Sequence, residues 1–272
     1  MSELSDVPRK RDAAPRPSAA WQTTGRRSGV RGSAVAYAFA IATFVLFALF
    51  VVVRQRRPFD LSTIAPYWSA IRSGFGLTLW VSLISLIASS VLGFVFYLLS
   101  VSHVRFFRAF TDVFTEIIYG TPLLVMIMIM AFVIGPAFGT TNRSVLGFIG
   151  LIVYMMPYMT NIFRSAISSI SSEQYMAMDL FGFTPYQRYR YIIVPQVIRV
   201  LMPPLMNNFS LIIKGSALLN VLSYRELFYE VTLMTNNTFR FVEGFLLMWG
   251  LYLVITIPLS QITKWIDRRW GI

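Results

Sequence analysis

The chain alternates between long apolar runs and shorter polar segments. Six runs reach the roughly 20 residues that an α-helix needs to cross a bilayer, and only one of them contains a charge, Lys214. The runs are Gly32–Val53, Phe75–Ser102, Ile117–Asn142, Ser144–Phe163, Val200–Ser223 and Gly244–Thr263, with the second span expected over Thr78–Leu99. The pattern predicts an all-α integral membrane protein that has five core transmembrane helices and one extra N-terminal helix.

The polar segment between the fourth and fifth runs, residues 171–199, predicts a helical hairpin. Its first half contains only residues compatible with a helix, and Gly182 follows at the position of a left-handed C-terminal cap. A second helix start comes next, with an N-cap hydroxyl, a first-turn proline and a capping-box glutamine: Thr184, Pro185 and Gln187. Pro195 is expected to end this second helix.

The remaining segments suggest how the chain is divided. Residues 1–31 are rich in Arg, Pro, Ser, Ala and Gly, and we expect a disordered basic cytoplasmic tail. Residues 32–70 are expected to hold the extra N-terminal span, without cleavage, and a segment along the outer interface that contains Tyr67 and Trp68. Residues 71–272 then form the main transmembrane domain.

Charge adds a topology to this picture. The chain is 56% hydrophobic and 13% charged, and its net charge is +12. If both termini are cytoplasmic, the cytoplasmic segments carry sixteen Lys and Arg residues and the outer segments carry seven, as the positive-inside rule expects. The cluster Arg54–Arg57 runs against the rule. This distribution assigns the positive charge to membrane topology, and nucleic-acid binding is not expected.

Several kinds of chemistry lack the necessary residues. The chain has no cysteine, and its only histidine is His103, so thiolate sites, histidine metal sites and Ser-His-Asp catalysis are not expected. The P-loop pattern G-x-x-x-x-G-K-[ST] does not occur, so any ATP that drives this protein must be hydrolysed on another subunit. We therefore expect a protein that is not an enzyme and that holds no cofactor or metal of its own.

Short motifs follow one another in a fixed order from about Ile71 to the C-terminus. They include Gly74-Phe-Gly-Leu-Thr78-Leu79, Gly120-Thr121-Pro122-Leu123-Leu124-Val125 after Glu116, Tyr158-Met-Thr-Asn161-Ile162-Phe-Arg164, Pro195-Gln196 before Pro203-Pro204, and Asn207-Asn208-Phe209 before Lys214. The intervals from Met176-Ala177-Met178 to Gly182 and Pro195 match those of the EAA loop. In this combination the chain resembles the inner-membrane permeases of ABC importers for polar amino acids, of the histidine/glutamine/arginine type.

This resemblance implies a type I importer permease fold in a bacterial inner membrane. It implies four kinds of partner: a dimer of ATPase subunits that binds ATP and Mg, a second permease subunit in a homo- or heterodimer, an extracytoplasmic solute-binding protein, and membrane lipid. It also assigns the segment 171–199 as the loop that couples to the ATPase. The coupling residues would be Glu173, Met176, Ala177, Asp179, Gly182 and Pro195.

The chain departs from the family pattern at several motif positions. Met176 replaces a glutamate that helps to fix the loop on the ATPase, so Glu173, Asp179 or the partner permease would have to supply that carboxylate. Tyr119 replaces an arginine and Asn161 a glutamate, while Gly215 and Ala217 replace an aspartate and a serine. Docking is therefore expected to depend more on shape and apolar contact than on a salt bridge.

Polar residues inside the predicted spans are candidates for a translocation path. Lys214 is the first of them, because a buried ammonium costs several kcal/mol unless it is paired. The alternatives for Lys214 are a structural pair with a carboxylate such as Glu116, or snorkelling toward an interface. Asn207 and Asn208 could hydrogen-bond a solute or a neighbouring helix. Asn161 is the fourth candidate for the path.

These observations lead to one functional hypothesis and two alternatives. The hypothesis is the permease subunit of an ATP-driven importer for polar amino acids or close relatives. A self-sufficient secondary transporter or channel would need intramembrane carboxylates, yet no Asp or Glu lies well inside any predicted span. A structural membrane protein would not need a polar, proline-containing fifth span.

Overall fold

The computed structural model describes residues 30–54 and 59–270, with side chains from residue 34 onward. The chain divides into two units, residues 1–58 and residues 59–272. The first unit contributes one helix, α1 (Val30–Val53). The predicted tail lies outside the described residues as far as residue 29, and only Arg54 of the cluster Arg54–Arg57 is described.

Helix α1 has the character of a membrane span. It is apolar around its whole circumference, and almost all of its described side chains are exposed within this chain. A helix of this kind is stable where lipid or another protein covers it on all sides. The stretch Ala34–Val53 satisfies the length and hydropathy of a span, which confirms the first predicted run.

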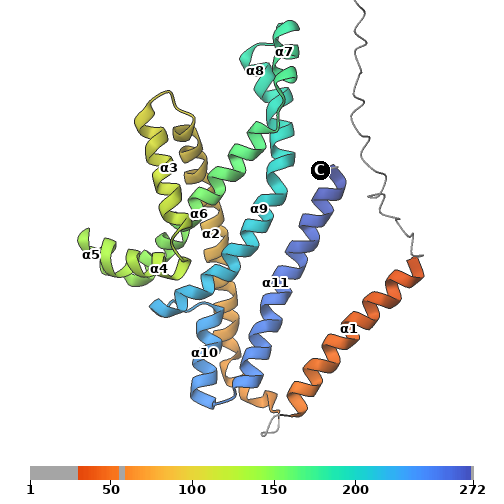
Figure 1. Ribbon diagram of the computed structural model, residues 1–272. Helices are drawn as coiled ribbons and strands as arrows, with labels where there is room; N and C mark the ends of the chain where they lie inside the picture. Colours follow the sequence, from red (N-terminus) through yellow and green to blue (C-terminus); the bar gives the residue numbers. More distant parts are fainter. Residues whose placement is uncertain (1–29, 55–58, 271–272) are drawn as a thin grey trace, which may run out of the picture. The chain divides into compact units, whose positions relative to one another are not determined.

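The second unit is built of helices throughout its described part. In chain order they are η2 (Leu61–Tyr67), α2 (Trp68–Ser100), α3 (Arg105–Tyr119), α4 (Leu123–Ile129), η3 (Met130–Ile134), α5 (Gly135–Ala137), α6 (Arg143–Ser168), α7 (Ser172–Leu180), α8 (Pro185–Gln187), η4 (Arg188–Ile193), α9 (Val194–Ser216), η5 (Ala217–Leu222), α10 (Leu227–Thr238) and α11 (Phe241–Trp270). The α7–α8 hairpin projects at one end of this unit, and α10 lies at the opposite end (Figure 1).

Four stretches of the second unit are long and apolar enough to cross a membrane, and a bent helix pair adds a further candidate. The stretches are Leu61–Ser100, Arg143–Ser168, Pro185–Leu222 and Phe241–Trp270. Together with α1 they confirm the all-α membrane architecture. The expected interfacial segment is helical as well: Tyr67 ends the 3-10 helix η2, and Trp68 begins α2.

The third predicted span, Ile117–Asn142, is wrong as a single helix. The chain bends by 111° between α3 and α4, at Gly120–Pro122. Pro122 has an extended backbone with φ −61° and ψ 140°, and it begins α4 as its N-cap. Because a proline has no N–H and disfavours a helical conformation in the residue before it, α3 cannot continue into α4. The amphipathic helix α3 and the apolar α4 thus form a bent pair, which the sequence did not predict.

The stop expected at Pro195 is also wrong. Helices α8, η4 and α9 form one uninterrupted helical run. Segment η4 is π-helical, and at its end the amide of Val194 donates to the carbonyl of Tyr189, five residues back. This wider turn shifts the backbone register so that Pro195 lies in the first turn of α9, where a missing N–H costs little.

Helices α2 and α6 pack closely at the centre of the second unit. The stripe of small residues on α2, made of Ser85, Ser89 and Gly93, is buried there. A Cβ atom at Gly93 would lie 2.5 Å from the Cβ of Met159 on α6, and the Gly93 carbonyl accepts a 3.0 Å hydrogen bond from the Thr160 hydroxyl. The stripe is therefore a packing seam within this chain, of the small-residue type common in membrane bundles.

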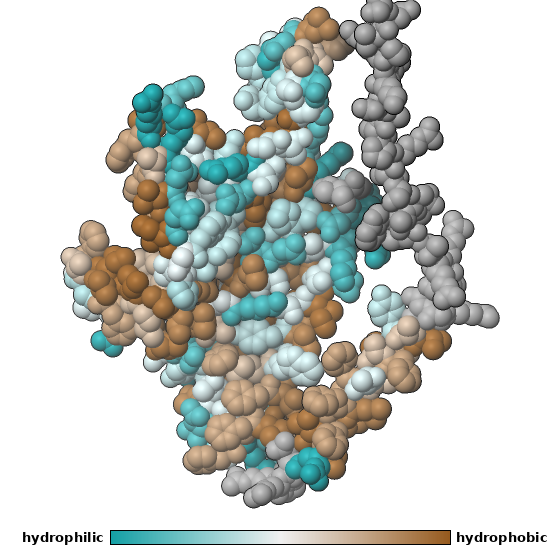
Figure 2. Space-filling view, in the orientation of Figure 1, coloured by the Kyte–Doolittle hydropathy of each residue, from teal (hydrophilic) through white to brown (hydrophobic). Residues whose placement is uncertain are grey.

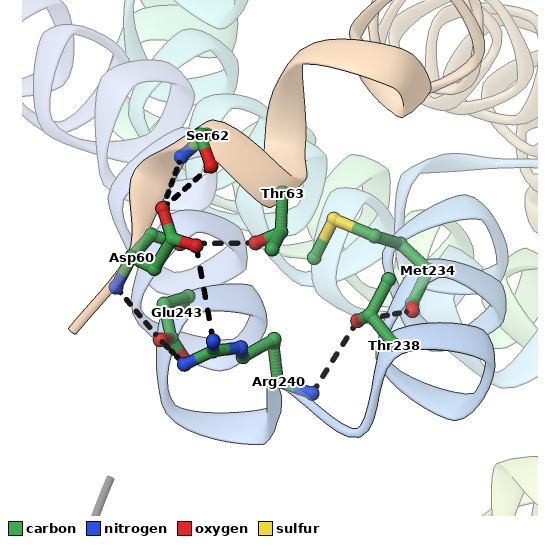
Figure 3. Close-up of polar contacts among 7 residues, drawn as sticks. All are labelled: Asp60, Ser62, Thr63, Met234, Thr238, Arg240 and Glu243. Carbon is green, nitrogen blue, oxygen red and sulfur yellow. Dashed lines mark hydrogen bonds and ion pairs between the residues drawn. The ribbon is translucent and has the colours of Figure 1, made fainter. Parts of the chain in front are cut away.

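A polar latch, formed by Asp60, Arg240 and Glu243, ties the start of the second unit to the α10–α11 turn (Figure 3). The amide of Asp60 donates to Glu243 Oε1 at 3.0 Å, and Arg240 contacts Glu243 at 3.3 Å and Asp60 at 3.7 Å. Hydrogen bonds from Ser62, with a smaller contribution from the Arg240 charge, hold the pKa of Asp60 below its ordinary value. Glu243 is only 5% exposed, so the latch compensates a buried carboxylate.

Replacing Arg240 with methionine is expected to lower the stability of the purified protein by about 1–3 kcal/mol, because Glu243 then loses a charged partner in a buried place. Thermal unfolding in detergent measures the effect. The double variant Arg240→Met, Glu243→Gln should recover part of the loss, since the remaining group is neutral. An unchanged melting temperature for Arg240→Met would show that the latch contributes nothing to stability.

Candidate functional site

The α7–α8 hairpin is the first candidate site, and its turn forms as the sequence predicts. Gly182 has φ +68°, a conformation that favours glycine, and α7 ends with two hydrogen bonds. The Phe183 amide donates to the Met178 carbonyl at 3.1 Å, and the Gly182 amide donates to the Asp179 carbonyl at 3.0 Å. This is the Schellman pattern. The predicted capping box, Thr184 with Gln187, is present at the start of α8.

Tertiary contacts then hold the two arms of the hairpin together. Met178 packs with Ile170 and Ile193 in a small buried cluster at the hairpin base. Asp179 on α7 forms a 2.5 Å ion pair with Arg188 on the second arm, and Arg188 Nε donates to the Phe183 carbonyl at 2.8 Å. The hairpin is thus a preformed shape, and the charge of Asp179 is already engaged inside it.

The surface of the hairpin is unusually apolar for a segment outside the spans. Leu180 is 85% exposed, Phe181 76% and Met176 60%. Three tyrosines on the second arm are exposed as well: Tyr186, Tyr189 and Tyr191. Figure 2 shows hydrophobic residues at the very tip of the hairpin, above more hydrophilic surroundings. Exposed apolar side chains gathered on one segment make the hairpin a candidate interaction site.

The six predicted coupling residues occupy different parts of this hairpin. Glu173, in the first turn of α7, is exposed, and a hydrogen bond from Ser171 lowers its pKa. Met176 and Ala177 are exposed on α7, and Gly182 forms the turn. Asp179 forms its ion pair with Arg188 inside the hairpin, and Pro195 lies beyond the hairpin, in α9. Of the two carboxylates, Glu173 has no ion pair among the described residues.

A polar groove between α9 and α11 is the second candidate site. The two helices lie side by side, and the groove between them encloses about 300 Å³. Its polar lining comes from one face of each helix: Asn207, Ser210 and Lys214 on α9, and Thr256, Ser260 and Thr263 on α11. Such a concentration of polar side chains between two apolar helices is unusual in lipid, which makes the groove a candidate for the path.

The groove has the chemistry of an anion-accepting, hydrogen-bonding site. Lys214 is the one charged residue among its lining residues, and it forms no ion pair within the part of the chain that the structure describes. The pair with Glu116 considered above is therefore not formed. The hydroxyls of Thr256 and Thr263 donate to carbonyls of their own helix at 2.9 Å, which leaves their oxygen lone pairs available as acceptors.

The other two path candidates lie elsewhere. Asn208 donates from Nδ2 to the Pro204 carbonyl at 3.1 Å, within α9, and its Oδ1 is buried without a partner. Asn161 on α6 donates to the hydroxyl of Tyr119 at the end of α3, and the Tyr119 ring packs edge-on against Tyr158 at 4.9 Å. The structure thus brings together Lys214 and Asn207 and leaves Asn208 and Asn161 outside the groove.

Sequence reasoning missed the hydroxyl face of α11 and a buried carboxylate, Glu226, between η5 and α10. Glu226 is fully buried and caps α10 by accepting 2.9 Å hydrogen bonds from the amides of Phe228 and Tyr229. It also accepts hydrogen bonds from Thr78 of α2 and Tyr252 of α11. Burial raises the pKa of Glu226, and these hydrogen bonds partly offset the shift.

Glu226 gives a physical reason for the motif that contains Gly74 and Thr78. A Cβ atom at Gly74 would lie 3.0 Å from the Glu226 backbone, so glycine permits α2 to approach this turn. Thr78 donates to Glu226 at 3.2 Å and accepts a 3.0 Å hydrogen bond from the Leu227 amide. The Thr-Glu pair therefore joins α2 to α10, and the motif spacing was the only signal of it in the sequence.

Comparisons with known proteins agree on one family. The family model described as "Binding-protein-dependent transport system inner membrane component" matches residues 89–272. A probable glutamine ABC transporter permease protein of Bacillus subtilis is 29% identical over 77% of this chain and 97% of its own length. The glutamine transport system permease protein of Escherichia coli K12 is 30% identical over 79% of this chain and 99% of its own length.

Solved structures show the same fold. An amino acid ABC transporter, crystallised with histidines, has a chain with a TM-score of 0.71 and 25% identity, which covers 78% of this chain and all of its own. A chain of the methionine ABC transporter MetNI, in inward-facing conformations, has a TM-score of 0.56 and 16% identity, and it covers 74% of this chain and 98% of its own. The second likeness concerns the fold alone.

Proposed function

The chain belongs to the family of binding-protein-dependent transport system inner membrane components, and from this premise we propose how it works as an ABC importer permease subunit. The α9–α11 groove contributes to the translocation path of a polar amino acid. The α7–α8 hairpin docks an ATPase subunit that carries ATP and Mg, so this chain needs no cofactor. The self-sufficient secondary transporter is not supported, since the relatives named above are ABC transporter permeases.

One observation carries the proposal: the second arm of the docking hairpin and one wall of the groove are parts of the same helical run. The second arm of the hairpin continues without a break through η4 into α9, within Pro185–Leu222. Lys214 and Asn207 lie on that same run. A displacement of the hairpin by the ATPase would therefore be transmitted directly along the helix to the groove wall. In this scheme ATP-driven closure draws two hairpins together and rocks two permease subunits between inward-open and outward-open states.

The chemistry of the groove supports a solute with a carboxylate and polar groups. An ammonium from Lys214 can bind the α-carboxylate of an amino acid, while hydroxyl and amide groups can hydrogen-bond a polar side chain. Two relatives are named for the transport of glutamine, an amino acid with a carboxylate and a polar side chain. Lys214 is exposed within a single copy of the chain, so a second permease subunit, identical or different, would enclose the path.

The proposed orientation places the hairpin and both termini in the cytoplasm. The charge distribution supports this placement, because sixteen Lys and Arg residues fall on the cytoplasmic side and seven on the outer side when both termini are cytoplasmic. A solute-binding protein would then deliver its cargo at the opposite end, where α10 and the latch lie. The whole assembly would act as a multi-pass complex of a bacterial inner membrane.

Reconstitution into proteoliposomes with the ATPase and solute-binding protein of the same transporter tests the proposal. We expect uptake of a polar amino acid that requires ATP and the binding protein, measured against a panel of labelled amino acids. As a control, vesicles that contain a non-hydrolysable ATP analogue in place of ATP should accumulate no amino acid. Accumulation at full rate without ATP would overturn the importer mechanism, and an apolar amino acid as the best substrate would overturn the proposed solute class.

A further inference from the structure

The hairpin holds a pocket of its own on α7, at the junction of its two arms. The pocket encloses about 270 Å³ and is lined mainly by apolar side chains: Ala177, Met178, Phe181, Phe183 and Ile192, with Gln174 and Gln196 at its wall. No carboxylate or cation is among these lining residues. The pocket is an open depression that adjoins the exposed apolar surface, and Phe181 belongs to both.

One polar atom in the pocket wall lacks a partner. Gln174 Oε1 is buried and accepts no hydrogen bond from the described residues. The second amide in the wall is already engaged, since Gln196 Nε2 donates to the Ile192 carbonyl at 3.0 Å. A buried acceptor without a donor destabilises the free protein. An unpaired acceptor beside an apolar cavity therefore points to an occupant that brings a hydrogen-bond donor.

We propose that this pocket receives a neutral aromatic side chain of the ATPase, a tryptophan or tyrosine, whose N–H or O–H donates to Gln174 Oε1. The inference rests on the proposed docking of the ATPase at the hairpin and adds the reverse contact, in which the ATPase inserts a residue into the permease. The ring packs between Phe181, Phe183 and Ile192, and its polar atom meets the glutamine. Trp and Tyr combine an apolar body with a donor, and they recur as anchors in protein interfaces.

Charge decides against a lysine or arginine in the pocket. A cation would lose its water there without a carboxylate in the wall to compensate it. Two acids, Asp179 and Glu173, lie next to lining residues in sequence: Asp179 is held by Arg188, and Glu173 is not among the lining residues. Arg190 and Arg199 add exposed positive charge to the same segment and would repel a cation further. A neutral donor carries neither cost.

Two substitutions test the pocket, and of the two residues only Gln174 lies outside the predicted coupling residues. Ala177→Phe fills the cavity, and we expect it to weaken the binding of the detergent-solubilised permease to its ATPase subunit by at least tenfold. Gln174→Met keeps the length of the side chain but removes the acceptor. It should raise the melting temperature of the permease alone, because the unpaired acceptor is gone, and yet weaken ATPase binding about three- to tenfold. A purely structural role for Gln174 would not move these two quantities in opposite directions.

Ser172→Phe is the matched control, since it adds the same ring to an exposed position of α7 that does not line the pocket. It should leave ATPase binding within twofold. If wild-type permease fails to bind its ATPase, the proposed docking fails. If the ATPase binds the wild type, Ala177→Phe and Gln174→Met equally well, docking stands and the pocket proposal is overturned.

Photo-crosslinking identifies the occupant directly. A benzophenone amino acid in place of Phe183, at the pocket wall, is expected to form an adduct with the ATPase, and mass spectrometry should map that adduct beside a Trp or Tyr. An adduct with the second permease subunit, or with the N-terminal segment of this chain, would overturn the proposal. So would an ATPase adduct in a region without an aromatic residue.

Discussion

Replacing Lys214 with methionine is expected to reduce ATP-driven uptake about 10- to 100-fold while the protein still folds and binds its ATPase. The loss corresponds to one charge-assisted hydrogen bond to a carboxylate, about 1.5–3 kcal/mol. Methionine keeps the length of the apolar stem, so packing along α9 is preserved. The measurement is the initial rate of labelled amino-acid uptake into proteoliposomes, compared with the rate of ATP hydrolysis in the same vesicles.

Lys264→Met is the matched control for this experiment. Lys264 is an exposed lysine near the end of α11, and it does not line the groove. The same change of residue type should leave its uptake rate close to that of the wild type. If Lys214→Met transports at the wild-type rate and folds normally, Lys214 has no part in the path, and snorkelling toward an interface becomes its explanation.

Replacing Gly93 with alanine is expected to destabilise the protein strongly, although alanine normally favours a helix. The added methyl carbon would lie 2.5 Å from the Met159 Cβ and 2.9 Å from the Met156 carbonyl oxygen, and neither atom belongs to the end of a flexible side chain. Overpacking of this kind costs about 1–3 kcal/mol or more, because α2 and α6 must move apart. Thermal unfolding and the yield of monodisperse protein from membranes measure the effect.

Gly76 provides an internal control in the same helix. A Cβ atom at Gly76 has no other atom of the described chain within 4 Å. Gly76→Ala should therefore be neutral or stabilise the permease by up to about 1 kcal/mol, the intrinsic helix preference of alanine over glycine. Equal melting temperatures for the two variants would contradict the close packing of α2 on α6.

Local rules explain why the hairpin turn was predictable. Gly182, Thr184 and Gln187 act on atoms a few residues away, so their effect depends little on the rest of the chain. Pro195 shows the limit of such rules. A proline usually ends a helix, but here one π-helical turn before Pro195 lets the helix continue. The contacts that α9 makes with α2, α6 and α11 balance the cost of that turn.

The candidate sites required information that no single segment carries. The groove combines a face of α9 with a face of α11, about fifty residues later, and the hydroxyls of α11 look like ordinary packing residues in the sequence. The same holds for Glu226, which becomes a buried cap only when Thr78 and Tyr252 reach it from two other helices. Lys214 was recognisable because a lone charge in an apolar run is rare.

The sequence by itself determined the helical membrane class, the capped hairpin and the family. The length of the apolar runs, the cap residues and the motif spacing can each be read from residues close together in the chain. Only the tertiary structure decided the break before α4, the passage of the helix through Pro195, the groove that Lys214 lines and the pocket beside Gln174. Each of these depends on which helices touch, and helix contacts in a membrane are set by close packing and by the pairing of buried polar groups. Those terms join residues far apart in the chain.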